Sequence, residues 1–371
     1  APLRAALADT LRRVLDAALA DSAFPGAYAA VGNARGVLAE YGVGRLDWAG
    51  SRLPGADRRP DARTLWDLAS LTKVVATTTA VGQLVGEGRV ALDAPVQRYL
   101  PEWTGGGKER VTVRHLLTHA GGLPAWRPLY KEATSPASAL ALVYASALDT
   151  LPAVRYVYSD LGAILLGQLV ERVTGRPLDA YVAERVFGPL GMRDTRYRPP
   201  AAELARTAPT EFDPWRQRKL QGEVHDENAA ALGGVAGHAG LFGSGHDLAR
   251  FARMYLGGGA LDGVRVLPSA VVAEFTTRQD SALSHRALGW ETPTGQNSAG
   301  RRIGAGAFGH TGFTGTSLWV DPRSDLFVLL LTNRVNPTRQ NTKIGAVRAR
   351  LADAAVAAAT GLASPPSPTG R

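Results

Sequence analysis

The 371-residue sequence contains no cysteine. Without thiols the chain has no disulfide bond, no thiolate metal site and no cysteine nucleophile, although this says little about its compartment. Long apolar stretches are also absent. No run reaches the roughly 18 apolar residues that a membrane-spanning helix needs, so we expect no membrane span.

The formal net charge of +9 rests on 42 basic residues, of which five are lysines. The arginines are scattered, and no basic stretch interleaved with aromatic residues occurs, so we expect no nucleic-acid partner. The chain also lacks the sequence signatures of one enzyme class and one binding class. The chain has no Gly-x-Ser-x-Gly elbow, which excludes an α/β-hydrolase, and no Walker pattern that would support nucleotide binding.

The two ends of the chain carry sheet-like patterns. Apolar spacing predicts a helix over residues 3–20, and alternating patterns around an Asn/Gly turn predict a hairpin of strands 26–31 and 37–44. Apolar runs at 312–320 and 326–332 predict two neighbouring strands, followed by a closing helix at 344–359. With 45% apolar and 20% charged residues, the chain suits one large globular domain or two closely associated ones.

The middle of the chain has a helical pattern instead. Gly and Pro residues separate helical candidates at 92–101, 113–117, 138–148 and 161–173. We therefore expect three parts, which are a discontinuous sheet domain (1–79 and 226–362), a helical subdomain (80–225) and a disordered Pro/Ser-rich tail (363–371).

The first chemical element is the run Asp67-Leu68-Ala69-Ser70-Leu71-Thr72-Lys73, which follows a strand-like segment and opens a helix. Ser70 and Lys73 are about one helical turn apart, so their side chains share a face. A buried amine there is able to take the serine proton, or to hold the base that does. The Ser70 N–H at the helix start would stabilise charge on an attacked carbonyl oxygen. By itself, Ser-x-x-Lys is weak evidence, because a helix-start serine and a surface lysine fit it equally.

The second element is Tyr158-Ser159-Asp160, directly before the helical candidate at 161–173. In a purely structural role, Ser159 or Asp160 would cap that helix, and Tyr158 would be a half-buried aromatic residue. A phenol ordinarily ionises at a pH of about 10, but a lysine ammonium nearby favours the phenolate. Tyr158 is therefore also a candidate general base.

The third element is Gly309-His310-Thr311-Gly312-Phe313-Thr314-Gly315-Thr316, at the start of a late strand. Glycines let a ligand approach backbone N–H groups closely, and the Phe313 N–H would be a second oxyanion donor beside that of Ser70. A lone His310 is more often structural, but a Gly-His-Thr-Gly run at a strand start is more informative.

A further stretch, residues 224–243, contains His225, Asp226, His238 and many glycines. It has no His-x-x-x-His ligand spacing, so we predict no metal site there. We interpret it as a loop that lines the cleft, and we include His238 among the substrate-contacting residues; plain structural turns are the alternative.

In this order and with these separations, the three motifs resemble those of the serine β-lactamase and penicillin-binding-protein family. The resemblance is nearest to the branch of class C β-lactamases, D-alanyl-D-alanine carboxypeptidases and esterases. The stretches 113–124 and 187–195 are also typical of that branch, and the resemblance covers roughly residues 10–355.

The resemblance implies an α/β fold, more narrowly α+β, in which an antiparallel sheet is flanked by helices and carries an inserted, mostly helical subdomain. It implies an acyl-enzyme on Ser70, with Lys73 and Tyr158 handling protons and the Ser70 and Phe313 N–H groups as the oxyanion hole. No metal and no organic cofactor are implied. The predicted substrate contacts are Asp160, His310, Thr311, Gly312 and His238.

Two departures from the family pattern bear on the substrate. Asp160 stands where many relatives carry Asn, and His310 stands where β-lactamases carry Lys. Because a substrate carboxylate needs a fixed cation and suffers from a nearby anion, we expect an esterase-like serine hydrolase of ester or amide bonds. Asp160 should also hold Lys73 protonated, which favours Tyr158 as the base. A D,D-carboxypeptidase or a weak class C-like β-lactamase is the alternative, and a non-catalytic protein that binds cell-wall fragments or acts as a scaffold is a third.

The expected partner is a small ester, peptide or β-lactam substrate, and the oligomeric state is left open. We expect export to the periplasm or cell envelope, because a processed, exported chain would begin as this one does, without Met. A shortened chain would begin in the same way.

Overall fold

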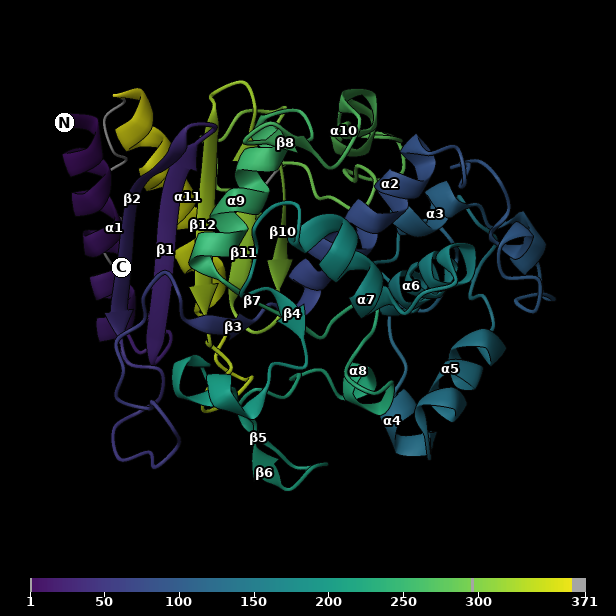
Figure 1. The fold of residues 1–371 in the computed structure, drawn as a ribbon, viewed down its shortest axis with the longest axis horizontal. Helices are drawn as coiled ribbons and strands as arrows, with labels where there is room; N and C mark the ends of the chain where they lie inside the picture. The colour runs from purple at the N-terminus through teal and green to yellow at the C-terminus, as the bar shows by residue number, and fades with distance from the viewer. Residues whose placement is uncertain (1, 295–296, 362–371) are drawn as a thin grey trace.

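The computed structural model of the protein describes residues 2–294 and 297–361. Its centre is a five-stranded antiparallel sheet in the order β10-β11-β12-β1-β2 (Figure 1). Two of these strands come from the start of the chain and three from its end, with bounds β1 (Gly26–Asn33), β2 (Gly36–Gly44), β10 (Phe308–Gly312), β11 (Thr316–Asp321) and β12 (Leu326–Thr332). The predicted mixed fold with an antiparallel sheet is therefore confirmed.

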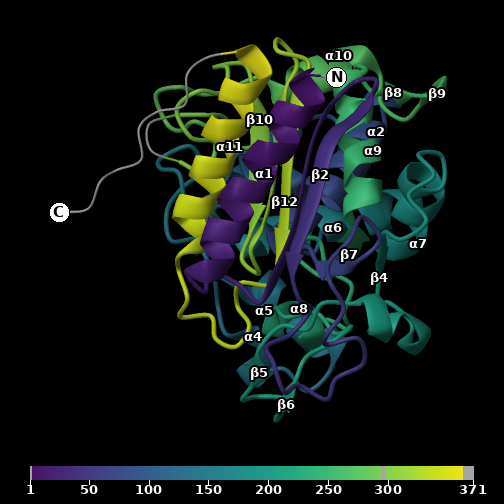
Figure 2. The same ribbon diagram turned by 90° about the vertical axis from the view of Figure 1, so that its left-hand side faces the viewer.

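Both faces of the sheet are buried, which explains why β1 and β12 consist almost entirely of apolar residues. Ala29 and Leu330 lie opposite each other in the ladder and face helices α1 (Pro2–Ala20) and α11 (Ile344–Thr360), which lie side by side in Figure 2. Ala30 and Leu329 face the other core, under α9 (Gly245–Leu256). Small alanines in β1 leave room for the helices on each face.

Helices dominate the chain between the two sheet-forming ends, to the right of the sheet in Figure 1. Their bounds are α2 (Thr79–Gly86), α3 (Val113–Leu117), α4 (Leu129–Glu132), α5 (Pro136–Ala145), α6 (Asp160–Thr174), α7 (Leu178–Val182), α8 (Glu227–Ala231) and, later in the chain, α10 (Ser269–Thr276). Short strands connect them, namely β3 (Leu65–Asp67), β4 (Arg196–Tyr197), β5 (Phe212–Asp213), β6 (Arg218–Lys219), β7 (Leu241–Ser244), β8 (Ala260–Leu261) and β9 (Val264–Arg265). Among the described residues, none of the helices combines the length and apolar character needed to cross a bilayer.

Most predicted elements occur where the sequence placed them, with three differences. The predicted strand 312–320 is the end of β10, a turn and β11, because Gly315 adopts φ +119°, which lets the chain reverse. The predicted helix at 92–101 is a single 3-10 turn at Val96–Arg98. The helix after Ser70 begins as a 3-10 turn (Ala69–Leu71) and a π-helical stretch (Lys73–Thr78) before α2.

The predicted tail (363–371) lies outside the described residues. The division into a sheet domain and a helical subdomain stays a prediction. It accords with a sheet built from both chain ends.

Candidate active site

Ser70 follows directly on a strained residue. Ala69 has φ +47°, a left-handed conformation whose strain is on the order of 1–3 kcal/mol for a residue other than glycine. The buried Asp67 carboxylate holds this segment in place by accepting hydrogen bonds from the N–H groups of Ala69 (2.9 Å) and His225 (2.6 Å). Strand β3 and the Asp67 carboxylate thus fix the segment that carries Ser70.

Lys73 is buried beside Ser70 and is surrounded by oxygen atoms. Its Nζ donates to Ser70 Oγ at 2.8 Å and to the His238 carbonyl oxygen at 3.2 Å, and it forms an ion pair with Asp160 Oδ1 at 2.7 Å. Burial by itself lowers the pKa of the Lys73 amine, but the charge of Asp160 and the Tyr158 side chain outweigh burial and raise that pKa. At neutral pH Lys73 is therefore an ammonium.

Tyr158 lies against this ammonium, just before α6. Lys73 Nζ is 4.9 Å from the centre of the Tyr158 ring, and the His119 ring lies on the tyrosine at 4.5 Å between centres. His119 Nδ1 accepts the Ser159 N–H at 3.0 Å, and Ser159 Oγ donates to the Pro124 carbonyl oxygen and caps α6. Burial holds the pKa of His119 well below its usual value, so a neutral ring supports Tyr158.

The turn after β10 is tied to the serine segment. Thr314 Oγ1 donates to the Asp67 carbonyl oxygen at 2.7 Å, and Thr316 Oγ1 donates to that of Leu68 at 3.0 Å. Gly312 permits this approach, because a Cβ atom there would lie 2.4 Å from the Leu68 oxygen. Phe313, which is half exposed, is thereby held next to the segment that carries Ser70.

These elements enclose a cleft of about 390 Å³, a size suited to a small organic substrate. Asp160 is not among the residues that line it; its carboxylate forms the ion pair with Lys73 that we expected, and its contact with a substrate stays a prediction. The lining residues are Ser70, Tyr158, Arg286, Glu291, His310, Thr311, Gly312, Phe313, Arg334 and Arg348.

His310 lines the cleft as a neutral group. Its Nδ1 is 2.8 Å from the Thr311 carbonyl oxygen, so Nδ1 carries the proton and donates it. Burial, together with the charges of Arg286 and Lys73, holds the pKa of His310 well below its usual value. No described residue hydrogen-bonds to its buried Nε2. His310 therefore does not supply the positive charge that a lysine would supply there.

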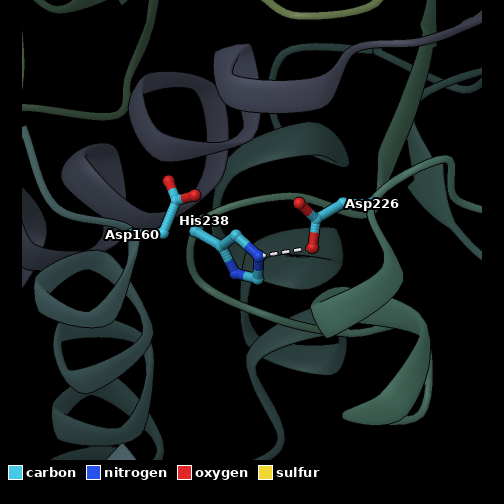
Figure 3. Close-up of side chains that lie close together, drawn as sticks. All are labelled: Asp160, Asp226 and His238. Atoms are coloured by element: carbon cyan, nitrogen blue, oxygen red, sulfur yellow. Dashed lines mark hydrogen bonds and ion pairs between the residues drawn. The ribbon is translucent and has the colours of Figure 1, made fainter. Parts of the chain in front are cut away.

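Behind Lys73, His238 lies between two carboxylates (Figure 3). Its Nε2 is 2.7 Å from Asp226 Oδ1, and its side chain is 1% exposed and absent from the cleft lining. The His238 ring pairs with Asp226, and its carbonyl oxygen accepts a hydrogen bond from Lys73. None of residues 224–243 is among those that line the cleft, and the predicted contact of His238 with a substrate stays a prediction.

Asp160, Asp226 and His238 have ligand atoms within 4.8 Å of one another, which a metal ion could bridge. However, the Lys73 ammonium already lies 2.7 Å from Asp160 and supplies a positive charge there. His238 and Lys73 together also hold the pKa of Asp226 below its usual value, although burial opposes this. The absence of a metal stays a prediction, which metal analysis of the purified protein would test.

The sequence did not reveal the parts played by Asp67, His119 and Arg286. Asp67 and His119 lie in stretches whose sequence patterns involve other residues. Their hydrogen bonds join loops that are distant in the sequence. Arg286 lies in a loop between α10 and β10 with no local pattern around it. The roles of these three residues can be recognised only from the fold.

A buried lysine that is hydrogen-bonded to a serine in the cleft wall, with a tyrosine ring against the same lysine, is the arrangement expected of a serine hydrolase site. The family model for beta-lactamase matches residues 11–353, and the chain belongs to that family. It is an enzyme of the serine hydrolase class, as the resemblance predicted.

Individual relatives differ in their named activities. A protein of Salmonella schwarzengrund (strain CVM19633), provisionally named a D-alanyl-D-alanine carboxypeptidase, is 33% identical over 327 residues, which cover 80% of this chain and 75% of that relative. A penicillin-binding protein homologue from Caulobacter crescentus has a TM-score of 0.76 at 22% identity, covering 96% of this chain and 98% of that one. A family VIII carboxylesterase has a TM-score of 0.73 at 24% identity, covering 95% and 97%. These two structures show the shared fold.

Proposed function

We propose that the protein hydrolyses carboxylic esters through an acyl-enzyme on Ser70. The observation that supports this best is the 2.8 Å hydrogen bond from Lys73 Nζ to Ser70 Oγ at the wall of the cleft. The bond aims the serine oxygen and places a fixed positive charge beside it. A protein that only binds fragments or acts as a scaffold has no need of such a nucleophile, so that alternative is disfavoured.

In the proposed mechanism the Tyr158 phenolate takes the proton of Ser70 as Oγ attacks the ester carbonyl carbon. Lys73 is an ammonium held by Asp160 and stabilises the negative charge that passes between Ser70 and Tyr158. The Ser70 and Phe313 N–H groups receive the oxyanion of the tetrahedral intermediate. Tyr158 then gives its proton to the leaving alkoxide, and water attacks the acyl-enzyme in the reverse sequence of proton transfers.

The serine nucleophile that would form the acyl-enzyme is tested with a fluorophosphonate probe, which phosphonylates it, and mass spectrometry. We expect a stable mass increase on the peptide that contains Ser70, and none in Ser70→Ala. An adduct on another residue, or none at all, would contradict the proposal. Rates on p-nitrophenyl esters, a chromogenic cephalosporin and a D-alanyl-D-alanine peptide, measured side by side, then define the activity.

A D,D-carboxypeptidase is the second candidate. Three arginines (Arg286, Arg334 and Arg348) line the cleft against a single glutamate, Glu291, and a peptide carboxylate would be attracted to them. The name of the Salmonella relative points the same way. Faster turnover of the peptide than of every ester would favour this candidate. A weak β-lactamase activity would appear only with the cephalosporin.

The name of that relative also supports an envelope-related role for this protein. Export to the periplasm or cell envelope is part of the proposal, and fractionation of the producing cells would test it.

A further inference from the structure

The turn between β10 and β11 carries the second proposed oxyanion donor, which is the N–H of Phe313. This N–H donates to no other described residue, so it is free to receive a substrate oxygen. It belongs to the peptide unit that joins Gly312 to Phe313. Because a peptide unit is planar and trans, its carbonyl and N–H groups point in opposite directions. A group that holds the Gly312 carbonyl oxygen therefore also fixes the direction of the Phe313 N–H.

Arg348, on helix α11, holds that carbonyl oxygen. Its Nη2 donates to the Gly312 oxygen at 2.6 Å and to the Thr316 oxygen at 2.8 Å. The Gly312 oxygen also accepts the Gly315 N–H at 3.0 Å, which closes the turn. A charged donor forms a stronger hydrogen bond than a neutral one and polarises the peptide that accepts it. The N–H on the other side of that peptide thereby becomes a better donor.

Arg348 is a cation at neutral pH, although its surroundings oppose the charge. Burial, together with the charge of Arg334, lowers the pKa of Arg348 to about 10, while the charge of Glu291 acts in the opposite direction. The buried Nε of Arg348 has no partner in the described part of the chain. An unpaired buried donor costs free energy, so stability alone does not explain an arginine at this position.

A second arginine holds the next peptide of the turn. Arg334 Nε donates to the Phe313 carbonyl oxygen at 2.7 Å, and its guanidinium carbon lies 4.4 Å from the centre of the Phe313 ring. Its Nη1 donates to the carbonyl oxygens of Arg339 (2.7 Å) and Asn341 (2.8 Å). The peptide units before and after Phe313 are thus both held by arginines, so this half-exposed residue keeps one orientation.

We propose that Arg348 is a positioning residue of the active site, which orients and polarises the Gly312–Phe313 peptide so that the Phe313 N–H stabilises the oxyanion of the tetrahedral intermediate. Arg348 acts through this peptide and does not touch the reacting atoms. The inference rests on the proposed function, because an oxyanion forms only if the site attacks a carbonyl group. Since the oxyanion develops in the transition state, loss of Arg348 lowers kcat and leaves KM nearly unchanged.

The kinetic test measures p-nitrophenyl ester turnover by Arg348→Met, which keeps most of the side-chain length but no donor. We expect kcat per folded enzyme to fall by at least about tenfold, with KM within about threefold of wild type. Arg348→Lys keeps the charge and a donor and should lose less. Arg265→Met is the matched control, because Arg265 Nη1 also bridges two carbonyl oxygens, those of Gly258 (3.0 Å) and Leu267 (3.1 Å), outside the cleft. It should keep the wild-type kcat.

The spectroscopic test observes the same peptide directly. Gly312-Phe313 is the only Gly-Phe pair in the sequence, so protein labelled with ¹³C at the glycine carbonyl and ¹⁵N in phenylalanine gives a single correlated signal for this peptide. We expect its ¹³C and ¹⁵N resonances to move upfield in Arg348→Met, because the hydrogen bond that polarises the peptide is lost. Arg265→Met should leave the signal in place.

An unchanged signal in Arg348→Met would overturn the proposal. A loss that appears in KM and not in kcat would overturn it as well, since Arg348 would then bind the substrate itself. If the signal moves but the wild-type enzyme hydrolyses no ester, the proposed function fails and the polarised peptide stands; ester hydrolysis with the wild-type kcat in Arg348→Met gives the reverse result. If Arg348→Met does not fold, the same two measurements on Arg348→Lys decide.

Discussion

At the scale of single residues, the charge state of Lys73 decides how the site works. A free lysine one turn from a serine would be a reasonable base, but this amine is paired with Asp160 at 2.7 Å and its pKa is raised. The proton of Ser70 must therefore go elsewhere, and Tyr158 lies against the same ammonium.

Replacing Tyr158 with Phe should slow phosphonylation of Ser70 by the fluorophosphonate probe by about 10²–10⁴-fold, because the proposed base is removed while the ring remains. The rate of adduct formation on Ser70 measures this. Tyr144→Phe changes a half-buried tyrosine outside the cleft and is the control. If Tyr158→Phe is phosphonylated at the wild-type rate, Tyr158 is not the base.

Asp160→Asn should shift the alkaline limb of the pH–kcat/KM profile to lower pH. The Asp160 charge raises the pKa of Lys73; without that charge only Tyr158 opposes the effect of burial, so the pKa falls and the ammonium is lost at lower pH. Asp149→Asn removes a half-exposed carboxylate and should leave the profile in place. An unchanged alkaline limb in Asp160→Asn would show that the protonated lysine is not required.

At the scale of elements, two irregular segments form the site. The chain passes from a 3-10 turn into a π-helical stretch between Ser70 and α2, and such stretches are frequent at functional sites. On the other side, the turn between β10 and β11 hydrogen-bonds to Asp67 and Leu68. The sheet edge and the first turn of the helix are thus held as one unit.

Gly312→Ala should disturb this unit. The added Cβ would lie 2.1 Å from Thr316 Oγ1 and 2.4 Å from the Leu68 oxygen, so β10 must move away from Ser70. We expect a loss of about 1–3 kcal/mol in the free energy of unfolding and a loss of more than about tenfold in kcat/KM. Gly345→Ala, with open space around its Cβ in α11, should instead stabilise the protein by about 0.5–1 kcal/mol. Urea unfolding and ester turnover measure both variants.

At the scale of the whole molecule, one sheet joins two hydrophobic cores. Leu329 packs in the core under α9, and its neighbour Leu330 packs under α1 and α11. Because both residues belong to β12 in the middle of the sheet, loss of either core should unfold the other.

Leu329→Ala and Leu330→Ala should each lower the free energy of unfolding by about 2–5 kcal/mol, since both side chains are buried. We expect circular dichroism and tryptophan fluorescence to report a single shared transition for each variant. Leu3→Ala, at a 40% exposed position in α1, should change stability by less than about 0.5 kcal/mol. Two separate transitions would mean that the cores unfold independently.

The sequence alone predicted much of this protein because the responsible signals are local. The spacing of apolar residues located α1, α6 and α11, and alternation with an Asn/Gly turn located the β1–β2 hairpin. The order of the three motifs identified the family. The helices, the hairpin and each single motif depend on residues a few positions apart, and local periodicity determines which face of a helix or strand is buried.

The tertiary structure decided which charges the site offers. The sequence predicted that Asp160 contacts the substrate and also holds Lys73 protonated, and the fold places its carboxylate 2.7 Å from the Lys73 amine. The fold also buries the His238 ring against Asp226, and the substrate contact predicted for this residue stays a prediction. Arg286 carried no signal, yet the fold places its unpaired Nη1 in the cleft wall. Charged side chains on loops far apart in the sequence pair through space, and burial strengthens the attraction between them. Only the three-dimensional arrangement therefore determines which charged side chains are neutralised by a partner and which remain for a substrate.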